Sequence, residues 1–90
     1  MKNIYEGLET GIFTYGDFER FMREQKAEFI KGRFSAGATA PYQIWHLKDA
    51  TVLYTCTDSM RSSYARVSAT GTKEAIGEVE KIILSQPVQK

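Results

Sequence analysis

Two side chains have the chemistry of a covalent catalyst, and each occurs only once in the chain: His46 and Cys56. An imidazole beside a thiol can generate a reactive thiolate, so a Cys-His dyad is the natural enzymatic hypothesis. The strand register expected below places the two residues on opposite faces of a sheet, whereas a register shifted by one residue would bring them to one face. We therefore expect Cys56 to be a small core residue and no dyad to form.

The other residue types that bind metals or catalyse reactions lack the spacing that such sites require. No group of His, Cys and acidic residues matches a zinc site, and no acidic loop matches an EF-hand. Glu78 and Glu80 lie two positions apart in an expected helix, where side chains do not face each other. The serines of the segment DSMRSSYAR have no neighbouring base in the sequence. We expect no enzyme activity, no metal and no small-molecule cofactor.

His46 and Cys56 both lie in the stretch from Tyr42 to Ala69. The residue pattern of this stretch predicts three β-strands in an antiparallel meander. If Asp49 and Ala50 form the first turn, Leu47 opposes Val52 and the side chains alternate between two faces. One face then carries large apolar residues opposite small ones, as close packing prefers. We expect that face to form the core, under the helices, with Trp45, Leu47, Val52, Tyr54, Cys56, Ala65, Val67 and Ala69.

The opposite face of the expected meander is amphipathic and basic, and no helix remains to cover it. Aromatic and Arg side chains are over-represented in binding hot spots, although a Tyr beside an Arg also stacks across strands for structural reasons alone. The candidate partner-binding residues lie on this face or, for Arg61, in the connection to the third strand: Tyr42, His46, Lys48, Tyr64, Arg66 and Arg61.

The segment before the meander predicts one long helix. Thr14 precedes Asp17 by three positions, a spacing that resembles a capping box, and Gly32 can end the helix. Residues 1–10 are expected to form either a short helix or an extended arm. Apolar side chains recur along one side of the expected helix over residues 15–31: Phe18, Phe21, Met22 and Phe29.

The segment after the meander predicts a second helix, over residues 73–84. Thr70 or Thr72 can cap its start, and its apolar residues gather on one side. Gly77 costs helix stability, and we expect it to allow close approach to the sheet. Residues 85–90 are expected to form a flexible tail.

The N-terminal third of the chain also contains a family-like pattern: a small helix, a Gly with two apolar residues, and a Thr with an acidic-Phe pair that opens a second helix. Its residues here are Leu8, Gly11, Ile12, Phe13, Thr14, Asp17, Phe18 and Lys26. In this pattern, residues 4–30 resemble the SHOCT (short C-terminal domain) family. The copy departs from the family because it is N-terminal in this chain. The resemblance implies a helical hairpin with a role in interaction or assembly.

Length and composition predict one folded domain over residues 1–90. Hydrophobic residues make up 42% and charged residues 26% of the 90 positions, values that are typical of globular rather than disordered chains. A single cysteine cannot form an internal disulfide, and no segment approaches the roughly 20 apolar residues of a membrane span. The N-terminus lacks the apolar core of a secretory signal. We expect a cytoplasmic protein with no membrane partner.

The expected fold class is α+β. An N-terminal helix, either alone or preceded by a short helix, would lead into the three-stranded antiparallel meander and a C-terminal helix. Both helices would pack on one face of the sheet.

Two functions agree with this sequence. The first is a small non-catalytic protein-binding module that regulates or inhibits a larger partner, for instance a phage or mobile-element protein, or that forms homo-oligomers. The alternative is nucleic-acid binding through Lys48, Arg61 and Arg66, with Lys31 and Arg33 as further candidates. The α-β-β-β-α order also occurs in double-stranded-RNA-binding domains, but fold does not determine function. Residues 31–70 carry five basic and two acidic side chains, a weaker basic bias than duplex binding usually requires.

Overall fold

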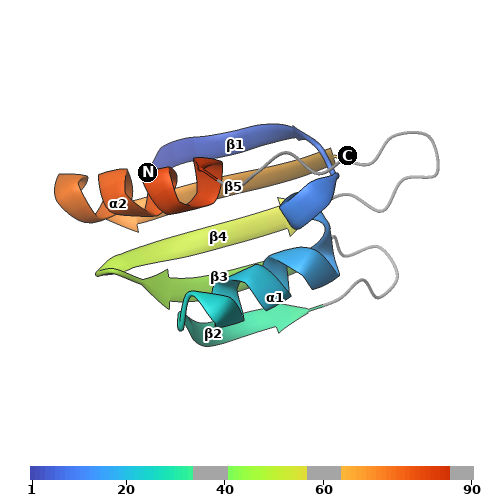
Figure 1. Ribbon diagram of the computed structural model, residues 1–90, viewed down its shortest axis with the longest axis horizontal. Helices are drawn as coiled ribbons and strands as arrows, with labels where there is room; N and C mark the ends of the chain where they lie inside the picture. The colour runs from blue at the N-terminus through green and yellow to red at the C-terminus, as the bar shows by residue number, and fades with distance from the viewer. Residues whose placement is uncertain (34–40, 57–63, 86–90) are drawn as a thin grey trace.

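The computed structural model describes residues 1–33, 41–56 and 64–85. Its strands form one antiparallel sheet in the order β1-β5-β4-β3-β2 (Figure 1). The elements in chain order are β1 (Lys2–Leu8), the 3-10 helix η1 (Gly11–Phe13), α1 (Tyr15–Glu24), β2 (Glu28–Arg33), β3 (Tyr42–Leu47), β4 (Ala50–Cys56), β5 (Tyr64–Gly71) and α2 (Lys73–Leu84). The α+β class is right, but the expected three-stranded sheet is wrong because a further strand extends it at each edge.

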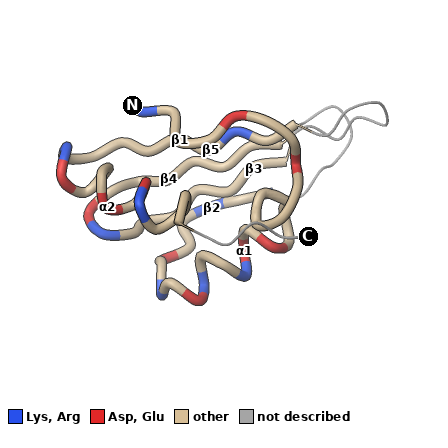
Figure 2. The backbone as a smooth tube through the Cα atoms, turned by 45° about the horizontal axis from the view of Figure 1, so that its top comes forward, with Lys and Arg blue, Asp and Glu red and all other residues tan. Residues whose placement is uncertain are grey.

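The molecule has two layers, with both α-helices on the same face of the sheet. Helix α1 lies over β3, and α2 lies over β5, β1 and β4. The turned view of Figure 2 keeps both helices on one side of the strands. The other face of the sheet has no helix on it within the described part of the chain. No helix there is long and apolar enough to cross a membrane.

The N-terminal segment is a strand, so of the two alternatives for residues 1–10 the short helix is wrong and the extended conformation is right. Strand β1 pairs antiparallel with β5, and the register shifts between Asn3 and Tyr5, which leaves Ile4 in a bulge. The bulged Ile4 is buried at 7% exposure. A strand this far in sequence from its partner is selected by the open hydrogen-bonding edge of β5, which no local periodicity reveals.

The expected helix over residues 15–31 is also wrong, because α1 ends at Glu24. Lys26 adopts the left-handed conformation with φ 62°, and its N–H donates to the Arg23 carbonyl oxygen at 3.0 Å. The Ala27 N–H donates to the Met22 carbonyl oxygen at 3.0 Å. These two bonds make a Schellman motif, which ends a helix and usually contains Gly where Lys26 stands. The residues after it form the edge strand β2.

The helix starts are as expected from their caps. The Thr14 hydroxyl accepts the Asp17 N–H at 3.4 Å, and the Thr72 hydroxyl accepts the Ala75 N–H at 3.1 Å. Each cap satisfies a backbone donor that the first helical turn leaves unpaired. The α-helices turn these side chains into the core: Phe18, Phe21, Met22, Ala75, Val79 and Ile83.

The register of the β3–β4 hairpin differs from the expected one by two residues. The turn is Lys48-Asp49, with φ 55° and 62° as in a type I′ turn, and Leu47 pairs with Ala50. Because side chains alternate with a period of two, a shift of two residues leaves every side chain on its expected face. All eight residues expected in the core are buried: Trp45, Leu47, Val52, Tyr54, Cys56, Ala65, Val67 and Ala69.

Buried polar groups join the two layers. The Trp45 indole N–H donates to the Gln43 side-chain oxygen at 2.7 Å, and the Gln43 amide donates to the Tyr15 carbonyl oxygen at 2.8 Å. The Tyr54 hydroxyl donates to the Phe13 carbonyl oxygen at 2.6 Å. The bonds to Tyr15 and Phe13 cross from the sheet to the start of the helical layer and fix its position, and the Trp45 bond orients the Gln43 amide for this contact.

Candidate functional site

The candidate site is the sheet surface that faces away from the helices, which we call the open face. Cross-strand partners share a face, so the printed register assigns its residues. From β1 across to β2 they are Asn3, Glu6, Leu8, Tyr64, Arg66, Ser68, Thr70, Thr51, Leu53, Thr55, Tyr42, Ile44, His46, Glu28, Lys31 and Arg33.

Four of the six predicted site residues lie on the open face. Tyr64 and Arg66 are on β5, and Tyr42 and His46 are on β3, with β4 between the two pairs. The sheet therefore separates them into two groups. Of the remaining two, only Lys48 is within the described residues.

Lys48 and Arg61 are not placed with the other four. Lys48 is in the β3–β4 turn and lines a shallow surface pocket with Glu78 and Lys81 of α2, on the helical side. Arg61 lies outside the described residues. The structure thus gives no reason to join either residue to the open face.

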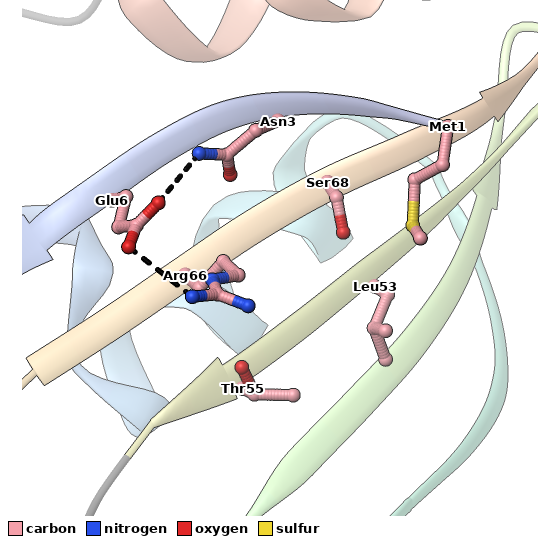
Figure 3. A pocket seen from close by; sticks show the side chains of 7 residues that line it. All are labelled: Met1, Asn3, Glu6, Leu53, Thr55, Arg66 and Ser68. Atoms are coloured by element: carbon pink, nitrogen blue, oxygen red, sulfur yellow. Dashed lines mark hydrogen bonds and ion pairs between the residues drawn. The ribbon is translucent and has the colours of Figure 1, made fainter.

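Sequence reasoning missed Glu6, which organises one end of the open face. Its carboxylate accepts hydrogen bonds from the Asn3 amide at 2.8 Å and from Arg66 Nη2 at 3.2 Å (Figure 3). It also accepts a hydrogen bond from the Tyr64 hydroxyl. Glu6 pairs with Arg66 across the β1–β5 register. The pairing of an acidic with a basic residue was available as a signal, but residues 1–10 were not expected to be a strand.

The hydrogen bonds of the cluster shift the pKa values of Glu6 and Tyr64 in opposite directions. The hydrogen bond from Tyr64, together with Arg66, holds the pKa of Glu6 below its ordinary value of 4.5. The same bond raises the pKa of Tyr64, because ionising the phenol would place two negative charges side by side. At neutral pH the cluster is therefore a carboxylate, a guanidinium and a neutral phenol.

A hollow of about 420 Å³ adjoins this cluster. Figure 3 shows the Arg66 guanidinium reaching from Glu6 toward the interior of the hollow, with Met1 and Leu53 on the far side. The lining residues come from β1, β4 and β5 and the chain start: Met1, Asn3, Glu6, Leu53, Thr55, Arg66 and Ser68. A cation, two hydroxyl-bearing side chains and an apolar wall thus line one hollow.

The other end of the open face, at β3 and β2, is more cationic. Lys31 and Arg33 project there beside Ile44 and Tyr42. Within residues 1–33, 41–56 and 64–85, neither cation lies within ion-pairing distance of a carboxylate. His46 Nδ1 is 4.0 Å from a Glu28 carboxylate oxygen.

The Cys-His dyad is not assembled. Cys56 is 4% exposed on the helix-covered face, whereas His46 is on the open face. No three metal-ligating side chains gather among the residues that the structure describes. These placements match the expected core role of Cys56.

Comparisons with protein-family models, with curated proteins and with solved structures gave no match for this chain. The resemblance of residues 4–30 to the SHOCT family therefore stays a prediction. The open face has to be interpreted from its own geometry.

Proposed function

We propose that the protein is a non-catalytic protein-binding module that occupies a larger partner through the open face, as a regulator or inhibitor. The observation that carries this proposal is a five-stranded sheet with one face covered by helices and the other uncovered. Protein interfaces combine apolar contact with oriented polar groups, and aromatic and Arg side chains dominate their energy. The open face has this composition.

The polar groups on the open face are already held in place. Tyr64 and Arg66 are bonded to Glu6, so their side chains lose less conformational freedom when a partner binds than unrestrained side chains do. Ile44 and Leu53 are half-buried between these groups and the β2 edge, and they offer apolar contact. Preordered polar groups around apolar contacts support a binding role.

The size of the open face favours a partner that reaches beyond it. Strands of about 20 Å spaced at about 4.8 Å give a five-stranded face an area of roughly 500 Å². A typical stable interface covers about 800 Å² on each partner. A transient complex could use the open face alone, whereas a stable complex would also contact the sheet edges or the adjoining turns.

Nucleic-acid binding remains the second candidate because Lys31 and Arg33 lie on the open face. Nucleic-acid affinity depends on cations that neutralise phosphates. The described open face has three cations, Lys31, Arg33 and Arg66, and two carboxylates, Glu6 and Glu28. Arg66 is already paired with Glu6. This near balance of charge supports a protein partner more than a phosphate backbone.

Affinity capture from the native host tests the proposal with two matched substitutions. Leu53→Arg places a charged side chain on the open face, and Leu84→Arg makes the same change at a half-exposed position of α2. We expect wild type and Leu84→Arg to recover the same protein partner, and Leu53→Arg to lose it. Nuclease treatment should not change the result.

Two results would contradict the proposal. Loss of the partner in Leu84→Arg but not in Leu53→Arg would assign binding to the helical layer. Release of every captured protein by nuclease would favour the nucleic-acid candidate. Circular dichroism of both variants shows whether each one is folded.

A further inference from the structure

The Glu6 cluster leaves an imbalance between hydrogen-bond donors and acceptors. Glu6 already accepts from Asn3, Tyr64 and Arg66. A guanidinium has five N–H donors in a planar fork. The ion pair of Arg66 with Glu6 uses Nη2, and a hydrogen bond to Tyr64 also engages the guanidinium, so its donors are only partly used. Within the described residues, Glu6 is the only carboxylate within ion-pairing distance of Arg66. The group that would complete this cluster is therefore an acceptor.

The hollow determines which kind of acceptor fits. Arg66 is 54% exposed and reaches into the hollow, which also has the hydroxyl-bearing side chains of Thr55 and Ser68. Leu53 and Met1 provide an apolar wall opposite. A carboxylate on a short aliphatic stem suits both sides of the hollow. Its oxygens match the planar fork of the arginine, and its stem can contact the apolar wall.

The other cations of the open face also favour a negatively charged partner. Lys31 and Arg33 are at the β2 end, and neither pairs with a carboxylate among the described residues. A segment that crosses the strands from β5 to β2 meets Arg66 first and these two cations last. Complementarity therefore favours acidic residues at both ends of that segment.

We propose that the hollow binds a Glu or Asp side chain from an acidic segment of a protein partner, with Arg66 as the group that receives its carboxylate. This inference rests on the proposed function and names the chemistry of the partner. Glu6 acts as the internal competitor for Arg66. A partner carboxylate binds to guanidinium N–H groups that Glu6 and Tyr64 do not use, or it displaces Glu6 from them.

A peptide titration of the full chain tests the proposal directly. The probe is a capped peptide in which Leu alternates with Glu, and its matched control has Gln in place of every Glu. The readout is the NMR signal of the Arg66 Nε–H together with the backbone amides of Leu53 and Thr55. We expect the Glu peptide to shift these signals with a dissociation constant of about 1 mM or tighter. The Gln peptide should bind at least about threefold more weakly, and added salt should weaken the Glu peptide.

Substitutions that should weaken peptide binding and one that should tighten it distinguish an effect on binding from misfolding. Arg66→Gln should weaken the Glu peptide about threefold to tenfold, and Arg66→Lys should weaken it less, because Lys keeps the charge but lacks the fork. Glu6→Gln should tighten it, because the internal competitor is removed. Arg20→Gln is the matched control, since Arg20 is an exposed arginine of α1 that pairs with Asp17.

Three results would overturn the proposal: equal binding of the Gln peptide, unchanged binding in Arg66→Gln, or no tightening in Glu6→Gln. A duplex oligonucleotide that shifts the Arg66 signal while the Glu peptide does not would assign the site to phosphate instead. If Leu53→Arg abolishes capture of the partner but the Glu peptide does not shift the Arg66 Nε–H signal, the proposed function stands and this inference is wrong. If capture does not depend on Leu53, both are wrong.

Discussion

Three donors converge on the Glu6 carboxylate, and this residue controls the electrostatics of one end of the open face. Arg66 in the absence of Glu6 would be a strong phosphate or carboxylate site. With Glu6 present, the cluster is neutral overall and its donors are oriented. The charge balance of the open face therefore depends on a residue from the N-terminal strand.

Acid should destabilise the wild type through Glu6. Its pKa in the folded state is lowered from 4.5, so its contribution to stability is present above pH 4.5 and is lost as the pH falls through the lowered value. The difference in melting temperature between wild type and Glu6→Gln should therefore be largest near neutral pH and shrink below pH 4.5. Thermal unfolding followed by circular dichroism across a pH series measures this difference.

The Tyr64 hydroxyl is the main cause of the lowered pKa of Glu6. In Tyr64→Phe, NMR of the Glu6 carboxyl should therefore show a higher pKa than in wild type. An unchanged pKa would exclude Tyr64 as the main cause of the lowering.

Tyr54 joins the sheet to the helical layer from inside the core. It is fully buried, its ring stacks on Phe18 at 4.7 Å, and its hydroxyl donates to the Phe13 carbonyl oxygen. Tyr54→Phe should lower the free energy of unfolding by about 1 to 2 kcal/mol, because the buried carbonyl loses its donor. Urea unfolding measures the change. Tyr42→Phe on the open face is the control and should stay within about 0.5 kcal/mol of wild type; equal losses in both variants would contradict this role of Tyr54.

The alternation of buried and exposed side chains along the strands can be predicted from the sequence, whereas the length of helix α1 cannot. Every residue of β3, β4 and β5 expected in the core is buried, because a period-two pattern fixes a face even when the turn is misplaced. Phe29, expected on the apolar side of the helix, is instead 43% exposed. The end of α1 was missed because Phe29 continues the helical spacing and the αL position carries Lys26 rather than Gly. The pattern therefore favours a last helical turn over residues 28–31, where the structure has most of β2.

Lys26→Gly should stabilise the protein. A residue with a side chain pays about 1 kcal/mol for the left-handed conformation, and Gly does not. We expect the free energy of unfolding in urea to rise by about 1 kcal/mol. Lys26→Ala should give little change, since Ala keeps the strain. A loss of stability in Lys26→Gly would show that the Lys26 side chain makes a contribution larger than this strain.

Two glycines should respond to alanine in opposite directions. A Cβ at Gly77 in α2 would have no heavy atom within 4 Å, so the expected close approach to the sheet is wrong, and Gly77→Ala should add about 1 kcal/mol of stability. Gly71 has φ 149°, and a Cβ there would lie 2.8 Å from the Asp49 carbonyl oxygen. Gly71→Ala should cost more than about 1 kcal/mol. Thermal unfolding of the two variants side by side measures both effects, and a shift of the same sign in both would contradict the packing described here.

At the scale of the whole molecule, the two edge strands convert a three-stranded sheet into a five-stranded one and enlarge the open face. Local pattern could not reveal either edge, since β1 and β2 are selected by pairing with β5 and β3 rather than by their own alternation. Four predicted site residues are on the open face, because their faces follow from strand alternation. Glu6 is missing from the predicted site because residues 1–10 predict an arm or a short helix. Lys31 and Arg33 are predicted only as nucleic-acid contacts, because the pattern places them at a helix end and in a loop.

The most direct test of the open face as the partner surface is hydroxyl-radical footprinting of the captured complex against the free protein. We expect Tyr42, Leu53 and Tyr64 to be oxidised more slowly in the complex. Leu84 and the other exposed side chains of the helical layer should react at the same rate in both states. Protection of Leu84, with Tyr42, Leu53 and Tyr64 unchanged, would contradict a binding role for the open face.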